Sequence, residues 1–141
     1  MKKYIVSLIL SILVVLIFGW ALYGVFVVGD KVKSSKSKAF FDSLGTAMIA
    51  YEIELGHRLT YSDLPNLVNM LEGDNSKGAF IYQFDPKNID ELGVIRDSFG
   101  NGVIMAIEQD CFVFLSYGPD RVSSAHRIDS DDIVHRVCRS E

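Results

Sequence analysis

The longest hydrophobic run of the chain lies near its N-terminus. Residues 4–29 contain no charged side chain, and nearly every position within them is apolar. A helix rises ~1.5 Å per residue, so these 26 residues span about 39 Å, more than the ~30 Å hydrocarbon core of a bilayer. Trp20 and Tyr23 lie toward the end of the run, where interfacial aromatic side chains are common. The pattern predicts a transmembrane helix over residues 1–29.

A cleavable signal peptide is the alternative explanation of this run. Its apolar region has about 7–15 residues and ends at a small-x-small cleavage site. The run here is longer and no convincing site follows it, so the sequence favours a retained anchor. Lys2 and Lys3 precede the run and four lysines follow it within residues 31–38. That count taken alone favours a cytoplasmic location for the C-terminal part.

After the apolar run, the pattern changes to that of an amphipathic helix. Apolar side chains recur at intervals of four, three and four along one face: Leu44, Met48, Tyr51 and Leu55. Gly56 then offers a helix stop. No proline or turn cluster separates this stretch from the apolar run. The sequence therefore predicts one long helix from about residue 4 to residue 55, whose segment 30–56 needs a packing partner.

Residues 57–141 read as short elements joined by turns. A second helix is expected from Ser62 or Asp63 to about residue 72, and a short strand at 79–84. A turn signal at 97–102 precedes a hairpin, and a final strand is expected at the end. The hairpin strands are residues 103–108 and 111–117, and the last strand is 133–137. The predicted fold is α+β, a long N-terminal helix packed on a small antiparallel β-sheet.

Charge is unevenly distributed along the chain. Residues 39–141 hold 8 Lys+Arg and 17 Asp+Glu, a net charge of −9. Such an acidic segment is a poor nucleic-acid partner and is compatible with a divalent cation. Cys111 and Cys138 either close one disulfide in an exported domain or remain two buried thiols. With no further Cys or His at ligand spacing, they do not form a zinc site.

Several motifs, taken in order, resemble those of type IV pilin-like proteins. The stretch 30–39 resembles a pilin juxtamembrane helix, and 44–58 resembles "LxxAlxxYxxxxGryP". Residues 97–101 resemble "D-x-W-G-N", and 116–120 followed by 131–133 resemble "S-x-G-P-D … D-D-I". Within this family, the closest resemblance is to the major, G-type pseudopilin of type II secretion systems.

The sequence departs from that family at its N-terminus. Family members carry a short leader that ends in Gly, followed by Phe, with a Glu at the fifth mature position. Here no Gly-Phe pair precedes the span and the span holds no Glu; an ungapped match puts that position near Val6. The subunit is therefore expected to be divergent, without a prepilin leader, or non-polymerising.

The resemblance implies a location, a role and partners. The N-terminus is expected in the cytoplasm, the span in the inner membrane, and residues 30–141 in the periplasm as a pseudopilin-like head. The head comprises the amphipathic helix 30–56 and an α/β part, 57–141. The expected function is that of a structural subunit of a type II secretion or type IV pilus-like apparatus. It would assemble into a filament with copies of itself or other pseudopilins through the N-terminal helix, on an inner-membrane assembly platform.

An acidic loop between residues 118 and 132 is the candidate metal site. Ca²⁺ takes 6–8 oxygen ligands, and the G-type family binds Ca²⁺ in its corresponding loop. By position, Asp120, Asp129 and Asp132 are the candidate ligands, with Asp131 as a further one. The alternative is a solvated acidic turn without a metal.

The sequence carries no recognisable catalytic motif. Histidines are scattered at 57, 126 and 135, and Ser116 and Ser123 lack the context of a nucleophile elbow. No enzymatic activity is expected. The second functional hypothesis is a membrane-tethered periplasmic binding or adaptor module that uses a pilin-like fold without polymerising, and the missing span Glu favours it.

Overall fold

The computed structural model describes residues 2–119 and 132–139, with side chains from residue 11 onward. The chain divides into two compact units, Met1–Lys33 and Ser34–Glu141. Helix α1, Lys2–Leu55, is continuous in secondary structure and belongs to both units. The single long helix expected from the hydrophobic pattern is therefore present.

The first unit is the apolar part of α1. Its side chains from residue 11 to residue 28 are exposed except for the half-buried Val27; Trp20 is 83% and Phe26 72% exposed. Within the described residues, α1 is the one helix long and apolar enough to cross a membrane. A single-pass anchor has these properties, and so does a signal sequence near the N-terminus.

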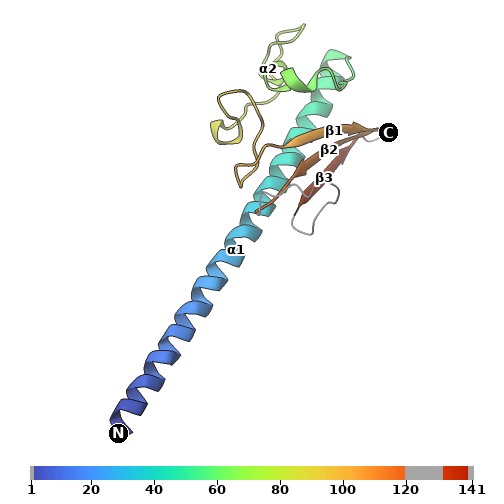
Figure 1. Cartoon of the computed structure of the whole chain (residues 1–141). Helices are drawn as coiled ribbons and strands as arrows, with labels where there is room; N and C mark the ends of the chain where they lie inside the picture. Colours follow the sequence, from blue (N-terminus) through green and yellow to red (C-terminus); the bar gives the residue numbers. More distant parts are fainter. Residues whose placement is uncertain (1, 120–131, 140–141) are drawn as a thin grey trace. The chain divides into compact units, whose positions relative to one another are not determined.

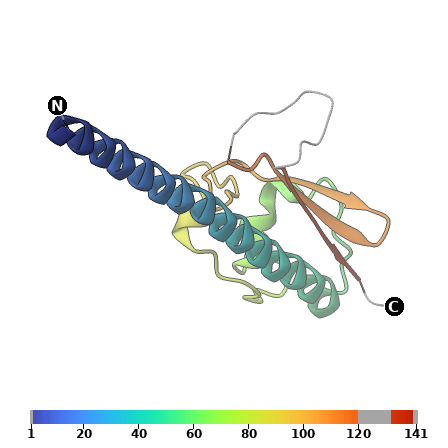
Figure 2. The ribbon, with the colours of Figure 1, turned by 90° about the horizontal axis from the view of Figure 1, so that it is seen from below.

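The second unit contains a three-stranded antiparallel sheet that lies along the C-terminal part of α1 (Figures 1 and 2). The strand order is β1-β2-β3, with β1 at Ile104–Glu108, β2 at Cys111–Ser116 and β3 at Ile133–Cys138. Gln109 and Asp110 form the tight turn between β1 and β2, and Gln109 has a φ of 52°. The predicted hairpin, the final strand and the α+β fold are confirmed.

The core forms where α1 meets the inner face of the sheet. The ring of Phe41 stacks on that of Phe114 with centroids 5.4 Å apart and planes 12° apart. The apolar face predicted for α1 supplies most of the helical side of this core, and the largest side chains on both sides have almost no exposed surface. The buried core residues include Phe41, Leu44, Met48, Tyr51, Phe99, Phe112 and Phe114.

A glycine sets how closely α1 and β3 approach. A Cβ built on Gly45 would lie 2.5 Å from both Cβ and Cγ2 of Val137. Two non-bonded carbon atoms at this distance would overlap, since their optimal separation is ~3.5–4.0 Å. The missing side chain at Gly45 therefore allows β3 to pack directly on the helix backbone.

The second predicted helix is shorter than expected and starts differently. Residues Leu64–Asn66 form a 3-10 turn, η1, and Leu67–Leu71 form α2. Pro65 lies in that first turn, where a missing N–H breaks no helical hydrogen bond. Asp63 precedes the turn, but its carboxylate accepts from Thr60 instead of capping the helix.

The strand predicted at 79–84 is absent, so that prediction is wrong. The backbone N–H groups of this stretch bond elsewhere: those of Ile81 and Tyr82 both donate to Leu71 O, and that of Ala79 donates to Asn75 Oδ1. Because these N–H groups are already bonded, they are not available to pair with a neighbouring strand. A further 3-10 turn, η2, follows at Pro86–Asn88.

Candidate functional site

Two of the motifs singled out in the sequence meet in a buried polar cluster. Asp97, only 3% exposed, lies at the start of the 97–102 turn. Its Oδ1 accepts hydrogen bonds from the backbone N–H of Phe99, at 2.9 Å, and of Asn101, at 2.7 Å. Its Oδ2 accepts from the hydroxyl of Ser116, a fully buried residue at the end of β2. Donors therefore satisfy both oxygens of this buried carboxylate, as burial of a charge requires.

The cluster extends from Ser116 into the loop that follows it. Gly118 N–H donates to Ser116 Oγ at 3.2 Å, and Gly118 O accepts from Asn101 Nδ2 at 2.6 Å. On the other side, the N–H of Ser98 donates to Oγ of Ser37, a fully buried residue of α1, at 3.0 Å. The helix, the turn and the end of β2 are therefore joined by side-chain hydrogen bonds, which rigidify such a junction.

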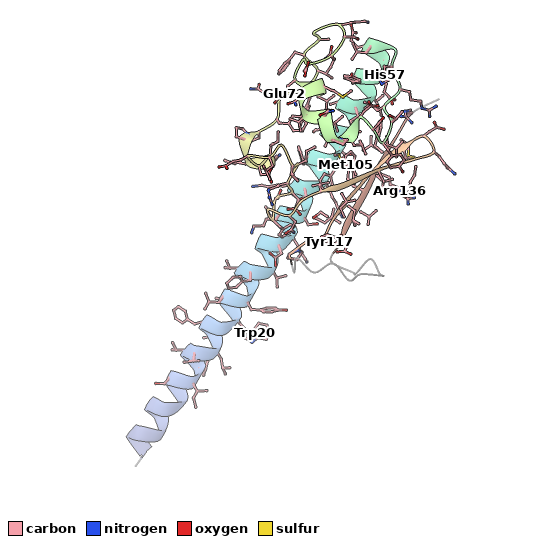
Figure 3. The ribbon with its side chains drawn as sticks, turned by 45° about the horizontal axis from the view of Figure 1, so that its top comes forward. Trp20, His57, Glu72, Met105, Tyr117 and Arg136 are labelled. Carbon is pink, nitrogen blue, oxygen red and sulfur yellow. A yellow bond between two sulfur atoms is a disulfide. The ribbon has the colours of Figure 1, made fainter. Side chains whose placement is uncertain are left out.

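This cluster forms the root of the acidic loop. Ser116 pairs with Ile133 in the sheet register, so the two ends of the segment between them lie side by side. In Figure 3, Tyr117 marks the point where the chain leaves β2. The arrangement holds the first residues of the loop in place through hydrogen bonds at Ser116 and Gly118.

The predicted calcium ligands fall mostly beyond what the structure describes. Asp120, Asp129 and Asp131 lie outside the described residues. Asp132 is half-buried directly before β3. Within residues 11–119 and 132–139, no three His, Cys, Asp or Glu side chains gather closely enough to hold a metal ion. Of the four candidate ligands, Asp132 alone lies within the described residues.

A second cluster ties the end of β3 to α1. Arg139 makes two hydrogen bonds of 2.6 Å to the carboxylate of Glu52, and Glu52 Oε1 also accepts from Leu59 N–H at 2.7 Å. The Arg139 guanidinium lies 4.7 Å from the ring centre of Phe112. The hydrogen bonds to Glu52 raise the pKa of Arg139 above its ordinary value. This bidentate pair fixes the last described residue of the chain on the helix.

The side of α1 that faces away from the sheet has an uncharged exposed stripe. Its residues recur at intervals of four, four, three, four and three, and all are exposed: Ser35, Ala39, Ser43, Thr46, Ala50 and Ile53. Ile53 is 79% exposed. The hydroxyls of Ser43 and Thr46 donate to carbonyls of their own helix, Ala39 O and Asp42 O, at 3.0 and 2.8 Å. Apart from Ile53, the stripe therefore presents small side chains, and the hydroxyls of Ser43 and Thr46 are already bonded.

The two cysteines lie opposite each other in the sheet and form a disulfide. Cys111 pairs with Cys138 in the β2–β3 register, and their sulfur atoms are 2.03 Å apart. Of the two alternatives left open by the sequence, the structure has the disulfide. Disulfides persist in oxidising compartments and are rare in the cytosol.

The clusters contain residues that sequence reasoning passed over. Ser37 continues the 37, 41, 44, 48 spacing of the buried face. Ser116 lies in the segment that resembles "S-x-G-P-D", but its hydrogen bond to Asp97 has no local signal in the sequence. Glu52 and Arg139 are 87 residues apart, and no local pattern links them. The buried position of Ser37 was therefore available from periodicity, whereas the Glu52–Arg139 contact was not.

Comparison with known proteins adds no further information on this site. No protein-family model, curated protein or solved structure matches the chain.

Proposed function

We propose that this chain is a membrane-anchored structural subunit of the pseudopilin type, which assembles with copies of itself or with other pseudopilins through α1. The observation that carries the proposal is the pair of opposite faces on the head part of the helix. One face is buried against the sheet, while the other is the uncharged stripe from Ser35 to Ile53. Small side chains let helices approach closely, and bonded hydroxyls need no water.

The apolar part of α1 supports the membrane location of the subunit. Its exposed side chains are those of a helix in lipid, without a charge between residues 4 and 29. In this proposal the helix crosses the inner membrane once and is retained. Copies held in one membrane share an orientation, which favours parallel packing of their helices.

The disulfide supports a periplasmic head. A Cys111–Cys138 bond is stable outside the cytosol, whereas the lysines that follow the span favour the opposite orientation. The positive-inside tendency is a bias of a few charges, while a reducing cytosol opposes disulfide formation generally. The proposal therefore has the N-terminus in the cytoplasm and residues 30–141 in the periplasm.

A role in type II secretion or a type IV pilus-like apparatus follows from the motifs. The segments that resemble "D-x-W-G-N" and "S-x-G-P-D" contact each other through Asp97, Ser116, Asn101 and Gly118. The two segments therefore form one hydrogen-bonded cluster, which gives both of them the same structural role in the head. In this proposal an inner-membrane assembly platform is the further partner.

Cross-linking in native membranes tests the assembly. A cysteine at Ala50, on the exposed stripe, is expected to give a covalent dimer with a short bis-maleimide at natural expression, since each copy then carries one free thiol. Lys38→Cys is the matched control, since Lys38 is exposed on α1 but lies outside the stripe. Equal cross-linking of the two variants, or monomers alone in both, would contradict assembly through this face.

Calcium is the proposed ligand of the loop that begins at Gly118. The root built on Asp97 holds one end of this loop, and Asp120, Asp129 and Asp132 supply carboxylates, with Asp131 as a further candidate. A cation that binds only the folded protein stabilises the folded state. A chelator is therefore expected to lower the thermal midpoint of the full chain in detergent. Each of the single variants Asp120→Ala and Asp132→Ala is expected to remove that effect. A chelator effect that persists in both variants would refute the ligand assignment.

A non-polymerising adaptor is the second candidate. The observation in its favour is the absence of a Glu from the apolar run, because in the pilin-like family that residue serves assembly. This alternative expects Ala50→Cys to remain monomeric in native membranes.

A further inference from the structure

The disulfide lies at an accessible corner of the head. It joins the ends of β2 and β3 beside the 109–110 turn, where Cys138 is exposed and Cys111 is half-buried. An open hollow at this corner is lined by Glu108, Gln109, Cys111 and Arg136. Figure 3 shows Arg136 on β3 at this end of the sheet. A thiol in solution can therefore reach the bond without opening the core.

The head has other contacts that hold β3 in place. Six residue pairs join β2 to β3, and Cys111–Cys138 is only the last of them. Directly after the disulfide, Arg139 N–H donates to Asp110 O at 2.9 Å, and its guanidinium binds Glu52. When the S–S bond opens, these contacts remain on both sides of it. The fold is therefore compatible with both the oxidised and the reduced state.

Two charged side chains of opposite sign, Arg136 and Glu108, line the hollow. Arg136 lines the hollow together with Cys111, and its Nη2 lies 3.2 Å from Glu108 Oε2. A guanidinium beside a sulfur stabilises the thiolate form, and a better leaving thiolate speeds exchange. Cys111 is half-buried and lines the hollow with Arg136, whereas Cys138 is exposed and is the residue open to attack.

We propose that Cys111–Cys138 is a thiol–disulfide exchange site of the folded head, attacked at Cys138 by a protein dithiol of the Cys-x-x-Cys class. The attacking thiolate forms a bond to Cys138 Sγ, the S–S bond breaks, and Cys111 leaves as a thiolate. The second thiol of the partner then displaces Cys138, so the partner becomes a disulfide and the head gains two electrons and two protons. The reverse sequence re-forms the bond. Exposed disulfides of this kind are the exchangeable ones.

Reduction kinetics test the exchange in the folded protein. Full-length protein in detergent is treated with dithiothreitol, quenched with acid, labelled with a maleimide and weighed by mass spectrometry. Denaturing the protein with guanidinium is expected to raise the reduction rate by less than roughly tenfold, since Cys138 is already accessible. The reduced protein is expected to keep its near-UV circular dichroism. Reduction that occurs only in denaturant, or loss of the near-UV signal on reduction, would overturn the proposal.

A second measurement identifies the attacked sulfur. With excess glutathione, acid quenching and alkylation by iodoacetamide, peptide mapping is expected to find glutathione on Cys138 and carbamidomethyl on Cys111. Glutathione on Cys111 and carbamidomethyl on Cys138 would overturn the proposal that Cys138 is the sulfur attacked.

A matched pair of variants tests the role of Arg136. Arg136→Gln is expected to slow the reaction with glutathione by roughly threefold to tenfold, because the Cys111 thiolate loses its neighbouring cation. Lys38→Gln removes one positive charge elsewhere on the head and is expected to leave the rate unchanged. Equal rates in both variants would exclude Arg136 from the exchange site.

Discussion

At the residue scale, one missing side chain fixes the packing of helix on sheet. Gly45→Ala gains about 1 kcal/mol of helix propensity but adds a Cβ at 2.5 Å from Val137. Overpacking of this kind costs about 1–3 kcal/mol, so the variant is expected to lower the free energy of unfolding. Urea unfolding measures it. Gly102→Ala is the control, since its Cβ would meet Val94 at an ordinary 3.7 Å. A Gly45→Ala protein at least as stable as the wild type would disprove the close approach.

The buried carboxylate of the loop root makes a second prediction at this scale. Asp97→Asn removes the charge from a group that accepts three hydrogen bonds, and hydrogen bonds to charged groups contribute about 1.5–3 kcal/mol. We expect a loss of this size in the free energy of unfolding. Asp85→Asn, whose exposed carboxylate accepts one bond from Lys87 N–H, is the control and is expected to cost less than about 1 kcal/mol. Equal losses would show that the Asp97 cluster does not stabilise the head.

At the scale of elements, the parts with regular periodicity were predictable. The buried face of α1 follows from the spacing of Leu44, Met48 and Tyr51, and the hairpin follows from two β-rich runs around Gln109-Asp110. The segment 79–84 has β-forming residues too, yet its N–H groups bond to Leu71 O and Asn75. Local β-propensity does not reveal that acceptors elsewhere in the fold will bind these N–H groups.

The candidate site was predictable only in part, because it depends on contacts between distant segments. The sequence motifs include Asp97 and Ser116, but their hydrogen bond spans 19 residues. The cysteine pairing depends on the β2–β3 register, which neither flanking sequence determines. Glu52 and Arg139 lie on elements that only the folded sheet brings together.

The turn that leads into η1 makes a prediction about acid stability. Hydrogen bonds from Thr60 Oγ1 and Thr60 N–H hold the pKa of Asp63 below its ordinary value. A lowered carboxyl pKa stabilises the folded state above the unfolded pKa of about 3.9, and this stability is lost as pH falls through the folded pKa. Asp63→Asn is therefore expected to flatten the decline of the free energy of unfolding below about pH 4, measured by urea titrations across pH. Thr60→Val, which removes the side-chain donor alone, is expected to lie between the two. Parallel acid profiles for wild type and Asp63→Asn would contradict this role.

At the scale of the whole molecule, the chain combines an apolar helix with an acidic head that has its own buried core. An apolar helix without charge between residues 4 and 29 is continuous in secondary structure with a helix whose face is buried by a sheet. The head carries a Cys111–Cys138 disulfide, and α1 has an exposed uncharged stripe. In our proposal, the span retains the subunit, the stripe joins it to others, and the loop root holds a calcium-binding segment.

The most direct test asks whether contacts between spans depend on the stripe of the head. Leu22→Cys, in the apolar part of α1, is expected to cross-link into a covalent dimer in native membranes at natural expression. Adding Ala50→Glu is expected to abolish that dimer, because it places a charge in the packed stripe, whereas adding Lys38→Glu is expected to preserve it. A Leu22→Cys protein that stays monomeric, or a dimer that Ala50→Glu leaves unchanged, would contradict assembly through α1.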